Sequence, residues 1–325
     1  MLIDVHNHFY PPEYLDALKR GDSEVKLTID AEGNPCIHYP GDYNVAVPGH
    51  RDIDYRQGVL EKEGVDTQII TFTTPGCHVE TPERAKRFAT LVNDAFAKIV
   101  KERSPRFASL ATLPLNDVQG SIAELNRAMT NLGFPGAMVF SNVNGVALAD
   151  PRYEPLWAEA NRLNAIIHIH PTDPVGVEAM TEYWLMPLVG FLADTTLAAA
   201  KLVFAGVPER YPNIKWVLGH LGGAIPYLAE RLDRGFEAFP DCRADIKVKP
   251  TDYLRNFYYD AVNFDPNAVR LAVDFAGADR VMAASDYPHQ IGSIGKMKSS
   301  MAALKVSDAE RKKIMGENAR ALYKL

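Results

Sequence analysis

Hydrophobic positions along the chain form short runs that alternate with longer amphipathic segments. The segments between the runs have helical spacing, as in residues 82–102 and 118–133. Eight runs of apolar and β-branched residues read as strands: 2–9, 67–72, 107–113, 136–142, 165–171, 214–220, 256–262 and 280–286. Alternation of this kind implies parallel strands with right-handed crossovers, and eight such units close a barrel. We therefore predict an α/β fold, a (β/α)8 TIM barrel, as one domain over residues 1–325.

Two stretches interrupt this rhythm. Residues 22–50 contain VKLTID and PCIHYP on either side of the turn-like AEGN, which predicts a small β-hairpin or lid inserted after the first strand. Residues 172–212 are too long for one barrel helix, so we expect extra helices after the fifth strand, over the mouth of the barrel. Both insertions follow strand ends, where barrel enzymes build their active sites.

Composition narrows the class of partner. With 47% hydrophobic and 23% charged residues, the chain has the make-up of an ordinary globular protein. A net charge of -6 provides no basic surface for nucleic acid or an anionic membrane, and we see neither a signal peptide nor a membrane-spanning stretch. Three widely spaced cysteines suggest neither a disulfide framework nor a thiolate metal site. We expect a cytoplasmic protein with a small-molecule partner.

Histidines gather at the carboxyl ends of the predicted strands. His6 and His8 lie two residues apart, so in an extended strand they share one face. Other polar residues end or follow the fifth, sixth and eighth strands: His168, His170, His220, Asp286 and His289. In a barrel these ends converge on one face, and imidazole with carboxylate suits zinc with an open position for water. The combination predicts a metal site, although a lone strand histidine is more often a satisfied core residue.

Spacing alone does not choose between His168 and His170, because both lie on one strand face. His170 is nearer the strand end and is the better candidate ligand. We expect His168 one layer down, hydrogen-bonded inside the barrel. The histidines of the predicted loops, His38, His50 and His78, read better as solvated or lid residues.

Several segments resemble the metal-dependent amidohydrolase superfamily, and within it the branch of aminocarboxymuconate-semialdehyde decarboxylase and related aromatic-acid decarboxylases. They run in order from residue 2 to residue 323: DVHNHF, LGFPG, IHIHP, EYWLMPLVG, YPNIKWVLGHLGGAIPY, SDYP and GENARALY. The resemblance therefore covers nearly the whole chain.

This resemblance implies a role for individual residues. One divalent metal ion, most often Zn2+ with Mn2+ as the alternative, would be held by four ligands: His6, His8, His170 and Asp286. His220 would act as acid or base beside it. Trp184 would line the substrate pocket, and Arg56, or less securely Arg51, would bind a substrate carboxylate. His289 is a hypothetical contact for a polar substituent of the substrate.

The relatives further imply a mononuclear centre and a homodimer. Binuclear members use a carboxylated lysine on the fourth strand, whereas this sequence has no lysine between Lys101 and Lys201. Relatives are commonly dimers, and the inserted helices could supply an interface.

The implied activity is a metal-dependent, non-oxidative decarboxylation of a small aromatic or conjugated unsaturated carboxylic acid. Either hydroxide adds to the conjugated system, or an acid such as Asp286 or His220 protonates the carbon that bears the carboxylate. The alternatives are hydrolysis of an amide, lactone or related carbonyl, hydration of an unsaturated diacid, and a scaffold barrel without activity. Convergence of so many polar groups at one mouth argues against the scaffold.

Overall fold

The computed structural model describes residues 1–21, 23–39 and 42–325. Each of the eight predicted runs contains a parallel strand, and the strands in chain order are β1 (Ile3–His8), β5 (Thr67–Thr71), β6 (Phe107–Ser109), β7 (Gly136–Phe140), β10 (Ile166–His170), β11 (Lys215–Leu218), β12 (Tyr258–Asp260) and β13 (Val281–Met282). The strands are short and buried, as expected when helices cover a parallel sheet.

The strands close into a barrel. Regular ladders connect β1-β5-β6 and β13-β12-β11-β10-β7. Two parallel bridges join these groups, one between Asn7 and Tyr287 and one between Ala111 and Ala137. Backbone hydrogen bonds support both bridges, with His8 N donating to Tyr287 O at 2.8 Å and Ala111 N to Gly136 O at 3.0 Å. The predicted TIM barrel is confirmed.

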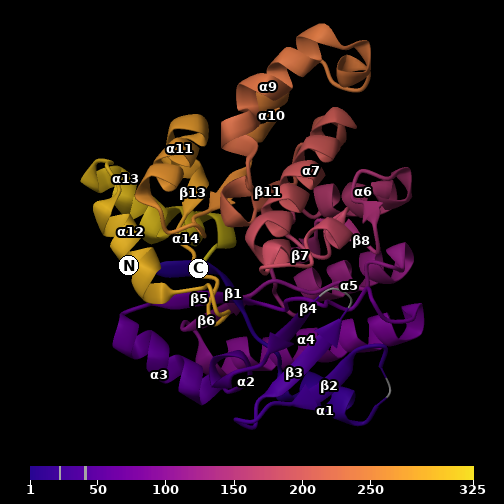
Figure 1. Cartoon of the computed structure of the whole chain (residues 1–325), viewed down its shortest axis with the longest axis vertical. Helices are drawn as coiled ribbons and strands as arrows, with labels where there is room; N and C mark the ends of the chain where they lie inside the picture. Colours follow the sequence, from indigo (N-terminus) through magenta and orange to yellow (C-terminus); the bar gives the residue numbers. More distant parts are fainter. Residues whose placement is uncertain (22, 40–41) are drawn as a thin grey trace.

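Helices surround the barrel (Figure 1). They are α1 (Pro12–Lys19), α2 (Pro48–Arg51), α3 (Ile53–Glu63), α4 (Pro82–Arg103), α5 (Val118–Thr130), α6 (Glu154–Arg162), α7 (Phe191–Phe204), α8 (Val207–Arg210), α9 (Ile225–Ala238), α10 (Pro250–Leu254), α11 (Pro266–Ala276), α12 (Ile294–Ala303), α13 (Asp308–Lys312) and α14 (Asn318–Tyr323). Helix α4 illustrates how the sequence determines a helix. Thr81 caps its first turn, and Phe88, Val92 and Phe96 recur every fourth residue on its buried face.

The insertion after β1 is larger than the predicted hairpin. It forms a three-stranded antiparallel sheet of β2 (Lys26–Ile29), β3 (Pro35–Tyr39) and β4 (Asp42–Val45), followed by α2. The hairpin corresponds to β2 and β3. The third strand was not predicted because its DYNV sequence lacks a β-branched run, and it exists through pairing with β3. A two-stranded ribbon of β8 (Asn142–Val143) and β9 (Val146–Ala147) follows β7.

The second insertion contains the expected extra helical segments. A 3-10 turn over Val177–Ala179 precedes a π-helical turn over Met186–Gly190, which continues into α7. The helix Met186–Phe204 is long and apolar enough to cross a membrane, with 39% of it buried. One such helix is weak evidence, because core helices have the same character. Asp194 within it is buried and accepts hydrogen bonds from Ser141 and Asn142, which ties the helix to the barrel. The absence of a membrane partner stays a prediction.

Candidate metal centre and substrate pocket

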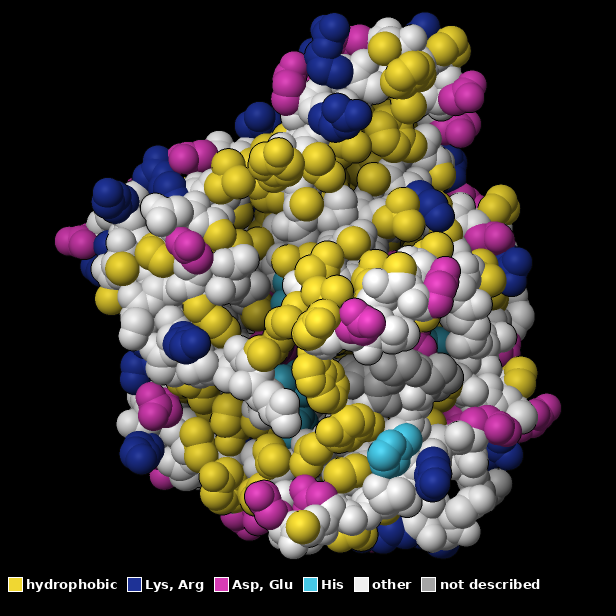
Figure 2. All heavy atoms as spheres, in the orientation of Figure 1, with side chains coloured by type: hydrophobic (Ala, Val, Ile, Leu, Met, Phe, Trp, Pro, Cys, Tyr) yellow, Lys and Arg dark blue, Asp and Glu magenta, His cyan; other side chains and the backbone are white. Residues whose placement is uncertain are grey.

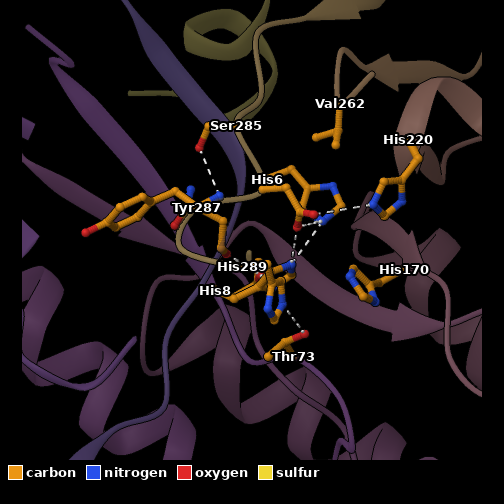
Figure 3. Close-up of polar contacts among 12 residues, drawn as sticks. His6, His8, Thr73, His170, His220, Val262, Ser285, Tyr287 and His289 are labelled. Atoms are coloured by element: carbon orange, nitrogen blue, oxygen red, sulfur yellow. Dashed lines mark hydrogen bonds and ion pairs between the residues drawn. The ribbon is translucent and has the colours of Figure 1, made fainter. Parts of the chain in front are cut away.

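Four buried side chains converge where β1 and β10 end and β13 is followed by its loop. The ligand atoms of His6, His8, His170 and Asp286 all lie within 4.8 Å of one another. The Nε2 atoms of His6 and His8 are 3.1 Å apart, and Asp286 Oδ1 lies 3.2 Å from Nε2 of His8 and 3.5 Å from that of His6 (Figure 3). Such a buried group of imidazole nitrogens with a carboxylate oxygen is a ligand set for a divalent cation.

Hydrogen bonds on the far side of the rings orient two of these ligands. His170 Nδ1 lies 2.6 Å from the carbonyl oxygen of Pro171, and His6 Nδ1 lies 2.5 Å from Asp260 Oδ2. Because both oxygens are acceptors, each Nδ1 carries the hydrogen and each Nε2 remains available to a cation. The residues present therefore fit one divalent metal ion.

Burial and neighbouring charges set the protonation of the cluster. Burial lowers the pKa of His8 and His170 well below 6.5, so both are neutral at pH 7. Burial alone would raise the pKa of Asp286. Hydrogen bonds from His220 and His8 outweigh this effect and hold the pKa of Asp286 well below its usual range. Burial likewise opposes charge on His6, yet Asp260 and Asp286 raise the pKa of His6 to about 9, so a cation that binds its Nε2 displaces a proton. An ionised carboxylate among imidazoles is the charge pattern that metal binding requires.

Asp260 organises the cluster from behind, and the sequence analysis missed it. This residue ends β12; its Oδ2 contacts His6 and also lies 3.2 Å from His168 Nε2, while its Oδ1 accepts the backbone N–H of His220 at 2.8 Å. His168 is buried and hydrogen-bonded one layer down, as expected. A signal was present, because Asp260 lies within the last three residues of the seventh predicted strand, near the face where Asp286 ends the eighth. A second potential ligand group, His6 with His168 and Asp260, shares His6 and is better explained as support for the first.

His220 stands beside the cluster in a strained turn. It follows β11 in a 3-10 turn over His220–Gly222, and its Nε2 lies 3.8 Å from Asp286 Oδ2. Its Nδ1 is buried without a hydrogen-bond partner in the described part of the chain. His220 and Asp286 both have left-handed backbone conformations, with φ of 52° and 56°. Non-glycine residues held in this region are often functional, because the surrounding fold must stabilise them against strain.

A cavity of about 610 Å³ opens above these residues. The candidate ligands His170 and Asp286 line this cavity together with His220 and Trp184. Trp184 is 55% exposed and its ring lies 5.8 Å from that of Tyr43. Figure 2 shows hydrophobic side chains gathered around a hollow in which histidine atoms are visible. The described lining combines apolar and aromatic side chains with a convergent group of histidines and Asp286, which is the character of a small-molecule site.

Neither candidate arginine reaches this cavity, which corrects the predicted carboxylate contact. Arg56 is completely buried, and its guanidinium donates to His8 O, Gly49 O and the side chains of Asn7 and Gln68. Arg51 donates to Ala46 O at 2.8 Å and, less closely, to Asn34. The hydrogen bonds explain this: Arg56 is held against β1 by His8 and Asn7, whereas Arg51 is held by Ala46 and Asn34 of the inserted segment.

Of the three histidines expected to be solvated or lid residues, two are not solvated but buried. His50 and His78 are each 2% exposed. His50 lines the cavity, and His289 lies beside it with its ring centre 5.0 Å away. His38 is partly exposed on β3 and its Nε2 lies 2.7 Å from Thr28 Oγ1. No pattern in the sequence distinguishes His50 from His38, because both belong to the same insertion.

Residues 3–325 match the family model described as amidohydrolase. The chain belongs to the amidohydrolase family. It is 35% identical over 271 residues to 2-amino-3-carboxymuconate-6-semialdehyde decarboxylase of Dictyostelium discoideum, covering 82% of this chain and 75% of the relative. It is 31% identical over 291 residues to gamma-resorcylate decarboxylase of Rhodococcus jostii, covering 84% of this chain and 87% of the relative.

Solved amidohydrolase structures share this fold. The chain superposes on a dihydroxybenzoic acid decarboxylase of Polaromonas with a TM-score of 0.84 and 26% identity, covering 100% of this chain and 97% of the other. That protein was crystallised with bound manganese and the inhibitor 2-nitroresorcinol. Since these relatives are named as decarboxylases, they confirm the predicted branch of the superfamily.

Proposed function

We propose that this amidohydrolase is a metal-dependent, non-oxidative decarboxylase of a small aromatic or conjugated unsaturated carboxylic acid. The observation that carries the proposal is the buried group of three histidines and Asp286, of which His170 and Asp286 line the cavity. The sequence relatives add the reaction class, because both remove carbon dioxide from an unsaturated carboxylic acid according to their names.

One divalent ion per chain would be held by His6, His8, His170 and Asp286. Three nitrogens and one oxygen suit zinc or manganese, and manganese is bound in the Polaromonas relative. When bound, the ion acts as a Lewis acid that stabilises negative charge on the substrate oxygens.

The remaining task for the protein is to supply a proton. Decarboxylation breaks the bond between ring carbon and carboxylate carbon, and a new carbon–hydrogen bond takes up one proton as carbon dioxide leaves. Asp286 is ionised, so we assign that proton to the His220 imidazole, which lines the cavity and whose buried Nδ1 has no hydrogen-bond partner among the described residues. The carboxylate of Asp286, 3.8 Å from His220 Nε2, stabilises the protonated ring.

We further propose a cytoplasmic homodimer in which Trp184 borders the bound substrate. Exposed apolar side chains near the pocket mouth, Tyr183, Leu188 and Val189, support a subunit interface on this face. The three cysteines are free, which is consistent with a reducing compartment.

The decisive experiment combines metal analysis with carbon dioxide release. Untagged protein purified without chelator should hold about one zinc or manganese per chain. It should release carbon dioxide from members of a panel of hydroxybenzoates and muconate semialdehydes, and stripping with chelator should abolish that release. The variant His220→Asn should keep the metal and the fold but lose about a hundredfold or more in turnover, because a positioned acid contributes about that factor. Hydrolysis of amides or lactones, or hydration of an unsaturated diacid, without carbon dioxide release would overturn the proposal.

A further inference from the structure

His50 is a buried histidine whose ring has no partner within the described part of the protein. It lies in α2 and lines the cavity, yet it is only 2% exposed. Both of its ring nitrogens are buried, and neither forms a hydrogen bond with any residue that the structure describes. Burying an imidazole with neither nitrogen paired is unfavourable, so such a group calls for a partner that the protein itself does not provide.

The backbone around His50 is firmly held. Its N–H donates to Val47 O at 2.8 Å and its carbonyl accepts from Tyr10 N at 2.7 Å. The preceding Gly49 packs so closely on the loop after β13 that a Cβ there would lie 2.4 Å from the Tyr287 hydroxyl oxygen. The unpaired ring is therefore positioned before any ligand arrives, which lowers the entropic cost of binding.

A second imidazole completes a polar patch on this wall. The ring centre of His289 lies 5.0 Å from that of His50 and 4.8 Å from that of the metal ligand His8. His289 Nε2 faces Thr73 Oγ1 at 3.4 Å (Figure 3). The patch thus lies beside the candidate metal site, because His289 bridges His50 and His8.

The charge of the cavity favours a neutral substituent. Among its described lining residues none is lysine or arginine, whereas Asp30 and Glu32 are present. Burial lowers the pKa of His50, so its ring is neutral and offers one donor and one acceptor. A hydroxyl group can donate one hydrogen bond and accept another, so it matches such a ring. A second carboxylate on the substrate would find no lysine or arginine among the described lining residues to compensate its charge.

We propose that His50 and His289 form a subsite that hydrogen-bonds a hydroxyl group on the substrate ring, and that this subsite selects hydroxylated aromatic monocarboxylates over dicarboxylates. The proposal rests on the decarboxylase function proposed above. It assigns His50 to substrate specificity, with no part in proton transfer.

Binding to the metal-loaded protein tests this subsite separately from turnover. The probes are benzoate, the three monohydroxybenzoates, 2,6-dihydroxybenzoate and isophthalate, with dissociation constants from calorimetry. At least one hydroxylated probe should bind about three- to tenfold more tightly than both benzoate and isophthalate. His50→Leu should remove that preference and leave benzoate affinity unchanged, while His50→Asn, which keeps a donor and an acceptor, should retain part of it.

The matched control is His38→Leu, the same substitution in the same insertion at a ring that bonds Thr28 and does not line the cavity. It should leave every affinity unchanged. Equal loss of benzoate and hydroxybenzoate in both His50 variants, no hydroxyl preference in the parent protein, or tightest binding of isophthalate would overturn the subsite. Absence of carbon dioxide release with the hydroxyl preference intact would instead overturn the decarboxylase function alone.

Discussion

The first barrel strand separates two buried polar clusters that differ in how completely they are paired. On the mouth side, His6 and His8 meet Asp286 with their Nε2 atoms crowded together. Behind the strand, Arg56 is equally buried but donates hydrogen bonds to four acceptors, two carbonyls and the side chains of Asn7 and Gln68. The first cluster has the ligand set for a cation, whereas the second contains its own cation, Arg56.

A glutamine links the rear cluster into one network. Gln68 accepts from Arg56 Nε at 2.7 Å and donates to Asp4 Oδ2 at 2.7 Å, and Ser285 also donates to Asp4. Burial lowers the pKa of Arg56 to about 10, so the guanidinium stays charged at neutral pH. Because Arg56 holds the carbonyl of His8, this network positions a candidate metal ligand, although none of its members is among the described residues that line the cavity. Burial of a polar group therefore does not identify a site; incomplete pairing does.

The largest expected effect is loss of the metal site. His8→Ala should lower decarboxylation by roughly a thousandfold, because a Lewis-acidic ion supplies several kcal/mol of stabilisation and each 1.4 kcal/mol is tenfold in rate. Metal content should fall while the circular dichroism spectrum stays unchanged. Full activity with the metal retained would remove His8 from the ligand set.

Removal of the buried Arg56 guanidinium should instead lower the free energy of unfolding. Arg56→Met should lower the free energy of unfolding by about 3–5 kcal/mol, since it leaves buried acceptors and the Asp4 carboxylate uncompensated. Urea denaturation of the metal-free protein measures it. Arg51→Met is the control, with less than about 1 kcal/mol expected for a partly exposed arginine. If both substitutions had the same small effect, the rear network would not be structural.

A substitution at Asp260 tests whether a residue that only orients the candidate ligand His6 affects metal affinity. Asp260→Asn should weaken metal affinity by about 10- to 100-fold, because His6 loses the carboxylate that orients its ring. Competition with a chelator of known affinity measures the change. The control is Asp233→Asn, which alters a buried carboxylate that binds Thr251 away from the centre. Metal affinity that responds equally to both would argue against a specific role of Asp260.

The smallest effect concerns a buried imidazole outside both clusters. Burial lowers the pKa of His78 from 6.5 to about 4, so the folded protein binds this proton less readily than the unfolded chain. Its contribution to stability is complete above pH 6.5 and is lost as the pH falls toward 4. Between pH 7 and pH 5 the parent should therefore lose about 2 kcal/mol more unfolding free energy than His78→Phe. Identical losses in the two proteins would show that His78 is not held neutral.

The sequence by itself determined the barrel and most of the candidate centre. Strand and helix periodicities are local, and side chains two residues apart on a strand share a face wherever that strand lies. For that reason the eight strands and the convergence of His6, His8, His170 and Asp286 could be predicted. The roles of these residues came from family resemblance, not from periodicity.

Tertiary structure decided the rest. Arg56 and His50 are six residues apart and both buried, yet one is paired by four acceptors and the other by none in the described chain. That difference depends on where α2 and α3 place each side chain against β1 and the loop after β13. Asp260 likewise acquires its role from contacts with residues more than 90 positions away. Hydrogen-bond pairing is a property of neighbours in space, so no pattern along the chain could reveal which buried polar groups remain free to bind a ligand.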